Sequence, residues 1–244
     1  MYNKKGVFLT AHWSYLCMFN YEVPKEILLP YVPPFTELDL HGGKALVSVV
    51  GFMFTNTKML GITWPLHKNF EEVNLRFYVK YFDGKIWKRG AAFISEIVPK
   101  PAISIIANVL YNEHYRYMPM KHKITTTAKD IDINFSWKKN GNWNTMQVVT
   151  GTEVIPIPIG SDAEFILEHY WGYNQLNKTT TIEYAVEHER WQIYDVKNFA
   201  LQADIKALYG QAFEPYINSV KPHSVFVAKG SDVLIRKPVS IVKG

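Results

Sequence analysis

The chain contains few of the residues from which enzyme classes are usually recognised. Cys17 is the only cysteine among 244 residues, which excludes an internal disulfide and a zinc site built from several cysteines. It lies in the apolar run 15–19, where a buried and unreactive thiol is the usual state. We therefore expect Cys17 to be part of the core rather than a nucleophile.

The common glycine-rich and nucleophile motifs are also absent. The sequence has no Gly-x-Gly-x-x-Gly, no Gly-x-x-x-x-Gly-Lys and no Gly-x-Ser-x-Gly, and these are the strongest signals of nucleotide binding and of hydrolase chemistry. The eight histidines show neither His-x-x-x-His nor His-x-His spacing. Glu187 and Glu189 share a predicted strand face, but two carboxylates alone are a weak metal signal. We predict neither a metal nor another cofactor.

Long runs of one charge or of apolar residues are missing too. The net charge of +5 arises from 27 Lys and Arg against 22 Asp and Glu, and the basic residues are not gathered into the blocks typical of nucleic-acid-binding arms. No apolar run reaches the ~18 residues of a membrane helix, and no signal-peptide core follows the N-terminus. These features predict a cytoplasmic protein without nucleic-acid or membrane partners, and they leave homo-oligomerisation open.

Most of the sequence has residue patterns that are typical of β-strands. With 48% hydrophobic and 15% aromatic residues, the chain can form one large domain over residues 1–244. Strands are predicted at 8–21, 45–55, 75–82, 85–98, 131–139, 142–155, 179–194 and 224–236, and helices at 24–29, 101–111, 161–170 and 196–208. The fold class is α+β, with a large, mostly antiparallel sheet curled into a barrel or cone.

Two dipeptides predict hairpins with two-residue loops. Asp83-Gly84 and Asn140-Gly141 each separate two strand patterns, and both tolerate the positive φ angles of a type I′ turn.

The segment 45–55 has almost no polar residue and is predicted to be buried on both faces.

The first candidate site lies in residues 70–78, whose alternation is that of a β-strand. Glu72, Asn74 and Arg76 occupy alternate positions and therefore share one face. A two-residue turn at 83–84 would place Arg89 opposite Tyr78 on that face. Two guanidiniums, a carboxylate and a phenol could bind a carboxylate-bearing molecule, or the row could be a solvated sheet face with salt bridges. A β-bulge would reverse the alternation.

The second candidate site is the polar and aromatic segment 110–123. Glu113 can extend the buried face of the preceding predicted helix, and a buried glutamate has a raised pKa suited to acid–base catalysis. The alternative is an amphipathic turn. Further polar and aromatic clusters occur at 169–173 and 187–191.

These segments together resemble a known family. Residues 8–13, 31–39, 70–76, 111–113, 169–173 and 187–188 look like the YqjF-like family of uncharacterised proteins, which is a domain-of-unknown-function family in the acetoacetate decarboxylase-like superfamily. The resemblance spans nearly the whole chain. It implies a cone-like antiparallel sheet around a central cavity.

The resemblance also implies where chemistry would lie. Acetoacetate decarboxylase forms a Schiff base on a lysine within an Arg-Glu-…-Tyr-Pro-Lys-Lys stretch, which is similar to residues 112–123 here. Glu113 and Pro119 match, the adjacent lysine pair is absent, and Lys121 and Lys123 fall later. We therefore expect both ammonium groups to be exposed and no decarboxylation of acetoacetate.

The leading prediction is a small-molecule-binding protein. The ligand-binding residues would be Glu72, Asn74, Arg76, Arg89, Tyr111, Glu113 and Tyr115. The alternatives are a decarboxylase-like enzyme that acts on a keto acid through Lys121 or Lys123, with Glu72 and Glu113 as further catalytic candidates, and a structural or interaction protein with no ligand.

Overall fold

The structure is a computed structural model that describes residues 6–101, 115–218 and 220–242. All its strands belong to one mostly antiparallel sheet. The strands are β1 (Val7–Val23), β2 (Glu37–Leu38), β3 (Ala45–Met59), β4 (Phe70–Phe82), β5 (Trp87–Val98), β6 (Tyr115–Tyr117), β7 (Met120–Thr126), β8 (Asp130–Lys139), β9 (Asn142–Pro156), β10 (Trp171–Asn177), β11 (Thr180–His188), β12 (Gln192–Gln202), β13 (Ser224–Ala228), β14 (Asp232–Arg236) and β15 (Val239–Val242). The described helices are α1 (Lys25–Leu28), the 3₁₀ helix η1 (Leu29–Tyr31), α3 (Asp162–Leu167), α4 (Ile205–Tyr209) and α5 (Glu214–Ile217).

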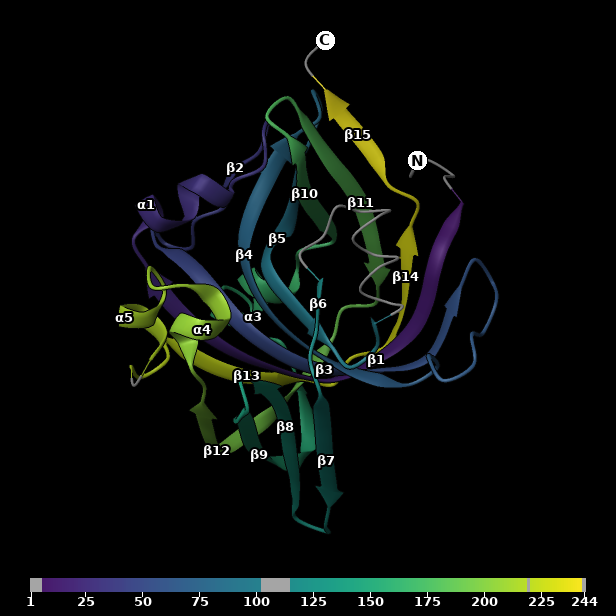
Figure 1. Cartoon of the computed structure of the whole chain (residues 1–244), viewed down its shortest axis with the longest axis vertical. Helices are drawn as coiled ribbons and strands as arrows, with labels where there is room; N and C mark the ends of the chain where they lie inside the picture. Colours follow the sequence, from purple (N-terminus) through teal and green to yellow (C-terminus); the bar gives the residue numbers. More distant parts are fainter. Residues whose placement is uncertain (1–5, 102–114, 219, 243–244) are drawn as a thin grey trace.

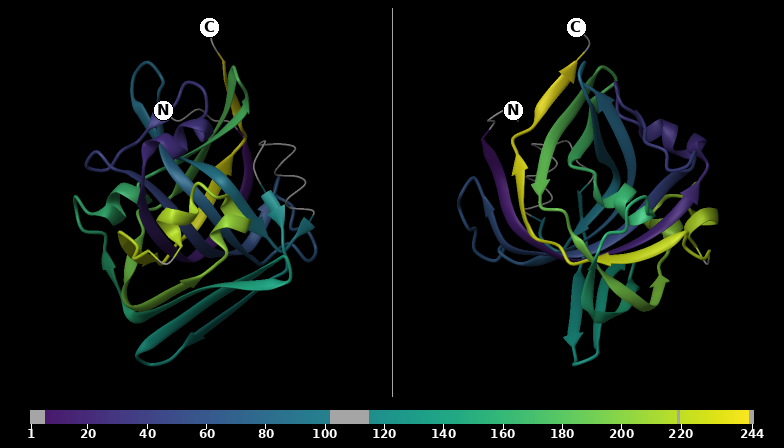
Figure 2. Two further views of the ribbon diagram at one scale, coloured as in Figure 1. Left: turned by 60° about the vertical axis from the view of Figure 1, so that its left-hand side comes forward. Right: turned by 180° about the vertical axis from the view of Figure 1, so that it is seen from behind.

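The sheet closes on itself. β14 pairs with β11 and also with β1, so the pairings run in a ring through β1, β3, β4, β5, β10, β11 and β14. From β1 the sheet continues outside this ring through β13, β12, β9, β8 and β7. Figure 1 shows β7, β8 and β9 projecting below the ring, and Figure 2 shows the same projection from behind. We call β7, β8, β9 and β12 the outer strands.

β3 is apolar along most of its length because both of its faces are covered. Val47, Val49 and Met53 belong to a core that also contains residues of the outer strands, whereas Val50 and Phe52 belong to a second core on the opposite face. The prediction of a strand buried on both faces is confirmed.

The contact between β3 and the outer strands depends on one glycine. A Cβ atom at Gly51 would lie 2.9 Å from Met146 Sδ and 2.9 Å from Phe135 Cδ2. These two side chains come from β9 and β8, so the absence of a side chain at Gly51 lets the outer strands pack directly on the ring.

One of the two predicted hairpin loops is confirmed. Lys139 pairs with Asn142, and Asn140 and Gly141 have φ values of 50° and 84°, as a two-residue type I′ turn requires.

The loop at Asp83-Gly84 is longer than predicted. Phe82 pairs with Trp87, so four residues, 83–86, connect the strands. The Asp83 side chain accepts hydrogen bonds from the backbone N–H groups of Lys85 and Ile86, each at 3.0 Å. An aspartate that satisfies two loop amides stabilises the wider turn, and the pairing shifts by two residues.

The helix predicted at 196–208 is mostly wrong. Residues up to Gln202 form β12, which pairs with β9, and the helix α4 begins after Asp204, whose side chain accepts from Ala207 N at 2.9 Å. β-branched and aromatic residues in 192–199 pair well with a neighbouring strand, and this tertiary pairing outweighs a local helix pattern.

The remaining predictions are close to the structure. The helix predicted at 161–170 is α3, which Ser161 caps by accepting from Glu164 N at 3.1 Å. The strands predicted at 179–194 and 224–236 are each divided into two, the second at Gly230, where φ is 83°. The helix predicted at 101–111 lies, apart from Pro101, outside the described residues.

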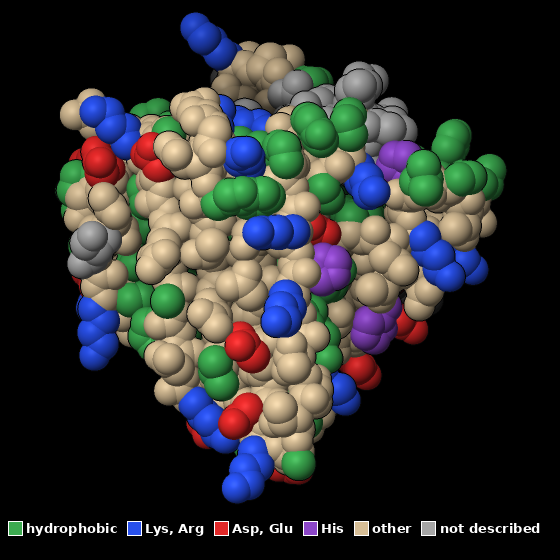
Figure 3. Space-filling model, turned by 60° about the horizontal axis from the view of Figure 1, so that its bottom comes forward, with side chains coloured by type: hydrophobic (Ala, Val, Ile, Leu, Met, Phe, Trp, Pro, Cys, Tyr) green, Lys and Arg blue, Asp and Glu red, His purple; other side chains and the backbone are tan. Residues whose placement is uncertain are grey.

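The charged side chains of the surface are mixed in sign. On the face shown in Figure 3, basic and acidic side chains are scattered among one another. Within the described ranges, no helix is long and apolar enough to cross a membrane.

Candidate functional site

A cavity of about 110 Å³, counted as the space open to the centre of a water molecule, is lined mainly by residues of the ring strands and of the segment around α3. That volume holds several water molecules or part of one small organic molecule. Most of the lining is apolar and includes Phe8, Leu9, Trp13, Leu16, Phe52, Phe54, Met59, Phe70, Phe93, Trp171, Tyr184 and Trp191. The polar side chains that line it are Glu72, Asn74, Arg76, Glu96, Tyr115, His169 and His188.

β4 supplies three of these polar side chains because it alternates strictly. Leu75 and Phe77 point away from the cavity and are fully buried in the core shared with the outer strands. Glu72, Asn74 and Arg76 line the cavity instead. The structure therefore brings together the three residues that the alternation placed on one face.

Glu72 is almost completely buried, with 2% of its surface exposed. Burial raises the pKa of its carboxyl group to about 7, although hydrogen bonds from Asn74 Nδ2 (2.9 Å) and Tyr115 Oη (3.0 Å) and the nearby charge of Arg76 lower it. A carboxyl group with such a pKa can donate or accept a proton near neutral pH.

Arg76 is half-buried beside Glu72 but forms no ion pair with it. In the described part of the chain no carboxylate lies within ion-pair distance of its guanidinium. Its Nη2 contacts Met18 Sδ at 3.8 Å, its guanidinium carbon lies 5.6 Å from the centre of the Tyr78 ring, and its buried Nε has no hydrogen-bond partner. The guanidinium therefore retains donors that a bound molecule can use.

A β-bulge adds an acid that sequence reasoning missed. Arg76 pairs with Phe93 but Leu75 pairs with Ser95, so Ile94 is an extra residue in β5. Beyond the bulge the two faces of β5 exchange, which places Glu96 opposite Asn74 and in the cavity lining. The sequence shows no signal for this bulge beyond the general rule that bulges reverse alternation.

Arg89 lies outside the cavity, contrary to its predicted place beside Tyr78. Because the turn is longer, Arg89 pairs with Lys80.

Arg89 and His169 both donate to Asp39. Arg89 Nε donates to Asp39 Oδ2 at 2.6 Å, and His169 Nε2 donates to the same oxygen at 3.1 Å. Although burial acts to raise it, these hydrogen bonds hold the pKa of Asp39 below its usual value. Burial lowers the pKa of His169 to about 4, so the neutral imidazole lines the cavity at neutral pH.

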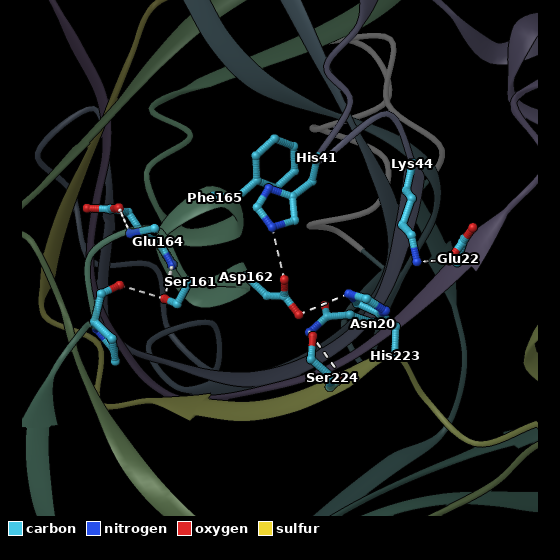
Figure 4. Close-up of polar contacts among 12 residues, drawn as sticks. Asn20, Glu22, His41, Lys44, Ser161, Asp162, Glu164, Phe165, His223 and Ser224 are labelled. Atoms are coloured by element: carbon cyan, nitrogen blue, oxygen red, sulfur yellow. Dashed lines mark hydrogen bonds and ion pairs between the residues drawn. The ribbon is translucent and has the colours of Figure 1, made fainter.

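The segment around α3 is held against the ring by a carboxylate between two histidines. Asp162 Oδ1 accepts from His41 Nε2 at 2.9 Å, and Asp162 Oδ2 accepts from His223 Nε2 at 3.0 Å. Figure 4 shows both imidazoles directed at Asp162, with Phe165 beside His41. These contacts fix the helix that precedes His169 and whose residues Ile166 and Leu167 line the cavity.

The predicted lysines do not reach the cavity. Lys121 and Lys123 are exposed on β7, as expected, and Lys121 Nζ lies 4.4 Å from the ring centre of Trp143. The predicted site residues Tyr111 and Glu113 lie outside the described residues. Tyr115, which donates to Glu72, is half-buried in the lining.

His169 and His188 are further lining residues that the candidate list did not contain. Both occur in the polar and aromatic clusters at 169–173 and 187–191. The clusters are the only sequence feature that points to these two histidines. Their spacing does not indicate that strands distant in sequence bring both histidines to one cavity.

The solved structures similar to this one share its fold. Acetoacetate decarboxylase from Legionella pneumophila superimposes with a TM-score of 0.63 at 14% identity, covering 98% of this chain and 90% of the other. The enduracididine biosynthesis enzyme MppR, complexed with pyruvate, gives 0.65 at 13% identity, with 96% and 90% covered. An acetoacetate decarboxylase-like enzyme from Sphingomonas wittichii RW1 gives 0.64 at 12% identity, with 98% and 95% covered. At these identities the likeness shows the fold alone.

Sequence comparison agrees with the resemblance drawn from the motifs. The uncharacterized protein YqjF of Bacillus subtilis (strain 168) is 30% identical over 119 residues, which is 48% of this chain and 48% of that protein. The match thus spans about half the length of this curated relative. The model of DUF2071, described as an uncharacterized conserved protein, matches residues 10–232. Because that match covers most of the chain, the protein is a member of the DUF2071 family.

Proposed function

We propose that the protein binds a small molecule that carries a carboxylate, and that Arg76 binds this carboxylate. The observation that carries the proposal is the state of the guanidinium: it borders the cavity, its buried Nε has no hydrogen-bond partner, and no carboxylate of the described chain neutralises it. Leaving a desolvated charge without a partner is unfavourable. A ligand carboxylate would supply both the charge and the hydrogen bonds that Arg76 lacks.

The rest of the cavity is consistent with such a ligand. In this proposal the closed ring of strands forms a cone-like barrel around the ligand, and the aromatic lining covers its apolar part. Glu72, with a pKa near 7, can be protonated when a carboxylate binds nearby, which removes the repulsion between the two acids. Asn74 and Tyr115 would hold Glu72 in place through the hydrogen bonds they already make.

A fold neighbour supports the choice of ligand class. MppR is complexed with pyruvate, a small carboxylate. The decarboxylase-like alternative has less support because it needs a lysine amine, and none of the described residues that line the cavity is a lysine.

The proposal is tested with pairs of ligands that differ only in charge. Small carboxylic acids with apolar substituents, such as 3-phenylpropionate and 4-methylpentanoate, are compared with the corresponding primary amides by thermal shift and calorimetry. We expect the acids to raise the melting temperature in proportion to RT ln(1 + [L]/Kd) and the amides to have much smaller effects. In Arg76→Gln the effect of the acids should be lost.

Arg190→Gln is the matched control, because Arg190 is exposed and lies outside the cavity lining. It should respond to the acids as the wild-type protein does. Equal binding of acids and amides, or undiminished binding of the acids by Arg76→Gln, would contradict the proposal.

A further inference from the structure

His188 is held edge-on at the cavity by two aromatic rings. Its ring centre lies 3.9 Å from that of Trp191, with 15° between the planes, and 4.6 Å from that of Tyr170, with 32° between the planes. Two rings cannot both stack at these distances on one face of an imidazole, so they cover opposite faces. The contact of His188 with the cavity is therefore made through the edge of its ring.

The tautomer of His188 is set by the backbone. Nδ1 lies 2.7 Å from the carbonyl oxygen of Glu189, and a carbonyl can only accept, so Nδ1 carries the hydrogen. In the neutral ring Nε2 then has a free lone pair. In the described part of the chain, nothing is hydrogen-bonded to Nε2.

The surroundings keep the ring neutral. Burial lowers the pKa of His188 to about 4. The charge of Arg76 acts in the same direction, whereas the hydrogen bond to the Glu189 carbonyl and the charge of Glu189 raise the pKa. Its neighbour on β11, Glu187, is already paired with Arg236 (2.8 and 3.0 Å). The cavity lining thus contains a cation, Arg76, and a neutral hydrogen-bond acceptor, Nε2 of His188, which is close enough to Arg76 for the charge to affect its pKa.

We propose that Nε2 of His188 accepts a hydrogen bond from a hydroxyl group of the ligand, so that the preferred ligands are hydroxy acids with an apolar body. The inference rests on the proposed function, since Arg76 would bind the carboxylate of the same molecule. An ammonium group is less suitable as the donor because the charge of Arg76 would repel it, whereas a hydroxyl is neutral. The apolar body would contact the aromatic lining formed by Trp13, Phe52, Phe54 and Phe70.

The test compares two acids that differ by one hydroxyl. The Kd values of 3-phenyllactate and 3-phenylpropionate are measured by calorimetry, and 2-hydroxy-4-methylpentanoate and 4-methylpentanoate form a smaller matched pair. One additional buried hydrogen bond predicts about a tenfold preference for the hydroxy acid. His188→Phe keeps the aromatic stack and removes the acceptor, so it should bind both acids of a pair equally. His67→Phe, outside the cavity lining, should keep the preference.

A spectroscopic measurement on the wild-type protein tests the same point without a variant. In a long-range ¹H–¹⁵N spectrum, Nε2 of His188 should resonate as an unprotonated nitrogen at pH 7, and it should shift when 3-phenyllactate is added but not when 3-phenylpropionate is added. A protonated Nε2 in the free protein would overturn the inference.

The outcomes separate this inference from the proposed function. Equal binding of the two acids by the wild-type protein, or a hydroxyl preference that survives in His188→Phe, overturns the role of His188 and leaves the carboxylate site intact. If the wild-type protein binds neither acid of either pair, the proposed function fails and this inference fails with it.

Discussion

The two faces of β4 differ in almost every physical property. On the face toward the outer strands, Val73, Leu75, Phe77 and Val79 are completely buried among apolar neighbours. On the face toward the cavity, the same strand presents an acid with a raised pKa, an amide and a guanidinium that has no carboxylate partner among the described residues.

The difference shows how the fold separates stability from binding. On one face of β3 and β4, residues of the outer strands and of α1, α4 and α5 complete a close-packed core, in which each lost methylene is costly. The other face can then keep polar groups that are incompletely satisfied, which reduces stability. We therefore expect substitutions on the two faces to have opposite consequences.

The largest effect is expected on the packed face. Phe77→Ala removes a fully buried ring from the core shared with the outer strands and should lower the free energy of unfolding by about 3–5 kcal/mol. Urea denaturation followed by tryptophan fluorescence measures this change. A loss below about 1 kcal/mol would mean that Phe77 is not packed in this core as the structure shows.

The next effect depends on pH and concerns Glu72. Its pKa is about 7 in the folded state, against an ordinary value of 4.5, so the folded protein holds this proton more tightly than the unfolded chain does. The contribution of Glu72 to stability is therefore full below pH 4.5 and is lost as the pH rises through 7. Glu72→Gln, which cannot ionise, should be more stable than the wild-type protein at pH 8.

The quantity to measure is the difference in free energy of unfolding between the wild-type protein and Glu72→Gln. Burial lowers the pKa of both His169 and His188 to about 4, so their contribution to stability rises with pH between about pH 4 and 6.5, opposite to that of Glu72. Both proteins contain these histidines, so their contribution cancels in the difference. The stability gap should change little between pH 8 and pH 7 and should narrow from about pH 7 to pH 4.5. A gap that is constant over this range would show that Glu72 titrates normally.

A smaller effect, opposite in sign to that of Phe77→Ala, is expected for Arg76→Met. Methionine fills similar space and removes a partly desolvated charge that has no carboxylate partner in the described chain, so the free energy of unfolding should stay equal or rise by up to about 1 kcal/mol. Binding of small carboxylates should be lost in the same variant. A loss of more than about 2 kcal/mol in stability would indicate that Arg76 is a structural residue.

No effect is expected at the lysines of β7. Both are exposed and outside the cavity lining, so treatment with acetoacetate or pyruvate and borohydride should leave no reduced adduct on Lys121 or Lys123 in the mass spectrum. Lys121→Ala should also leave carboxylate binding unchanged. An adduct on Lys121 that disappears in the alanine variant would restore the decarboxylase alternative.

The sequence predicted those features that depend on a short stretch of chain. Alternation along β4 placed Glu72, Asn74 and Arg76 on one face, and Asn140-Gly141 specified its turn, because side-chain direction and φ preference are local properties. The apolar run of β3 likewise indicated a strand with both faces covered. The motif resemblance led to the correct family.

Features that depend on distant partners could not be predicted in this way. Residues 196–202 have a helix-compatible pattern but pair with β9. Arg89 pairs with Lys80 instead of Tyr78 because the hydrogen bonds accepted by Asp83 widen the turn between β4 and β5. His169 and His188 reach the cavity through the pairing of β10 and β11 with β5 and β14, which no local pattern specifies. Their charge state depends on burial, which is known only from the fold.

The bulge in β5 has a consequence for comparing sequences of this family. In an ordinary strand, gaining or losing one residue exchanges the two faces beyond that point. Here Ile94 is the residue in excess, and a chain without it would pair Ser95 with Leu75 and Glu96 with Asn74 in unbroken register. A homologue one residue shorter at this position would therefore keep its acid in the cavity, and an alignment gap there would mark a straightened strand rather than an altered site.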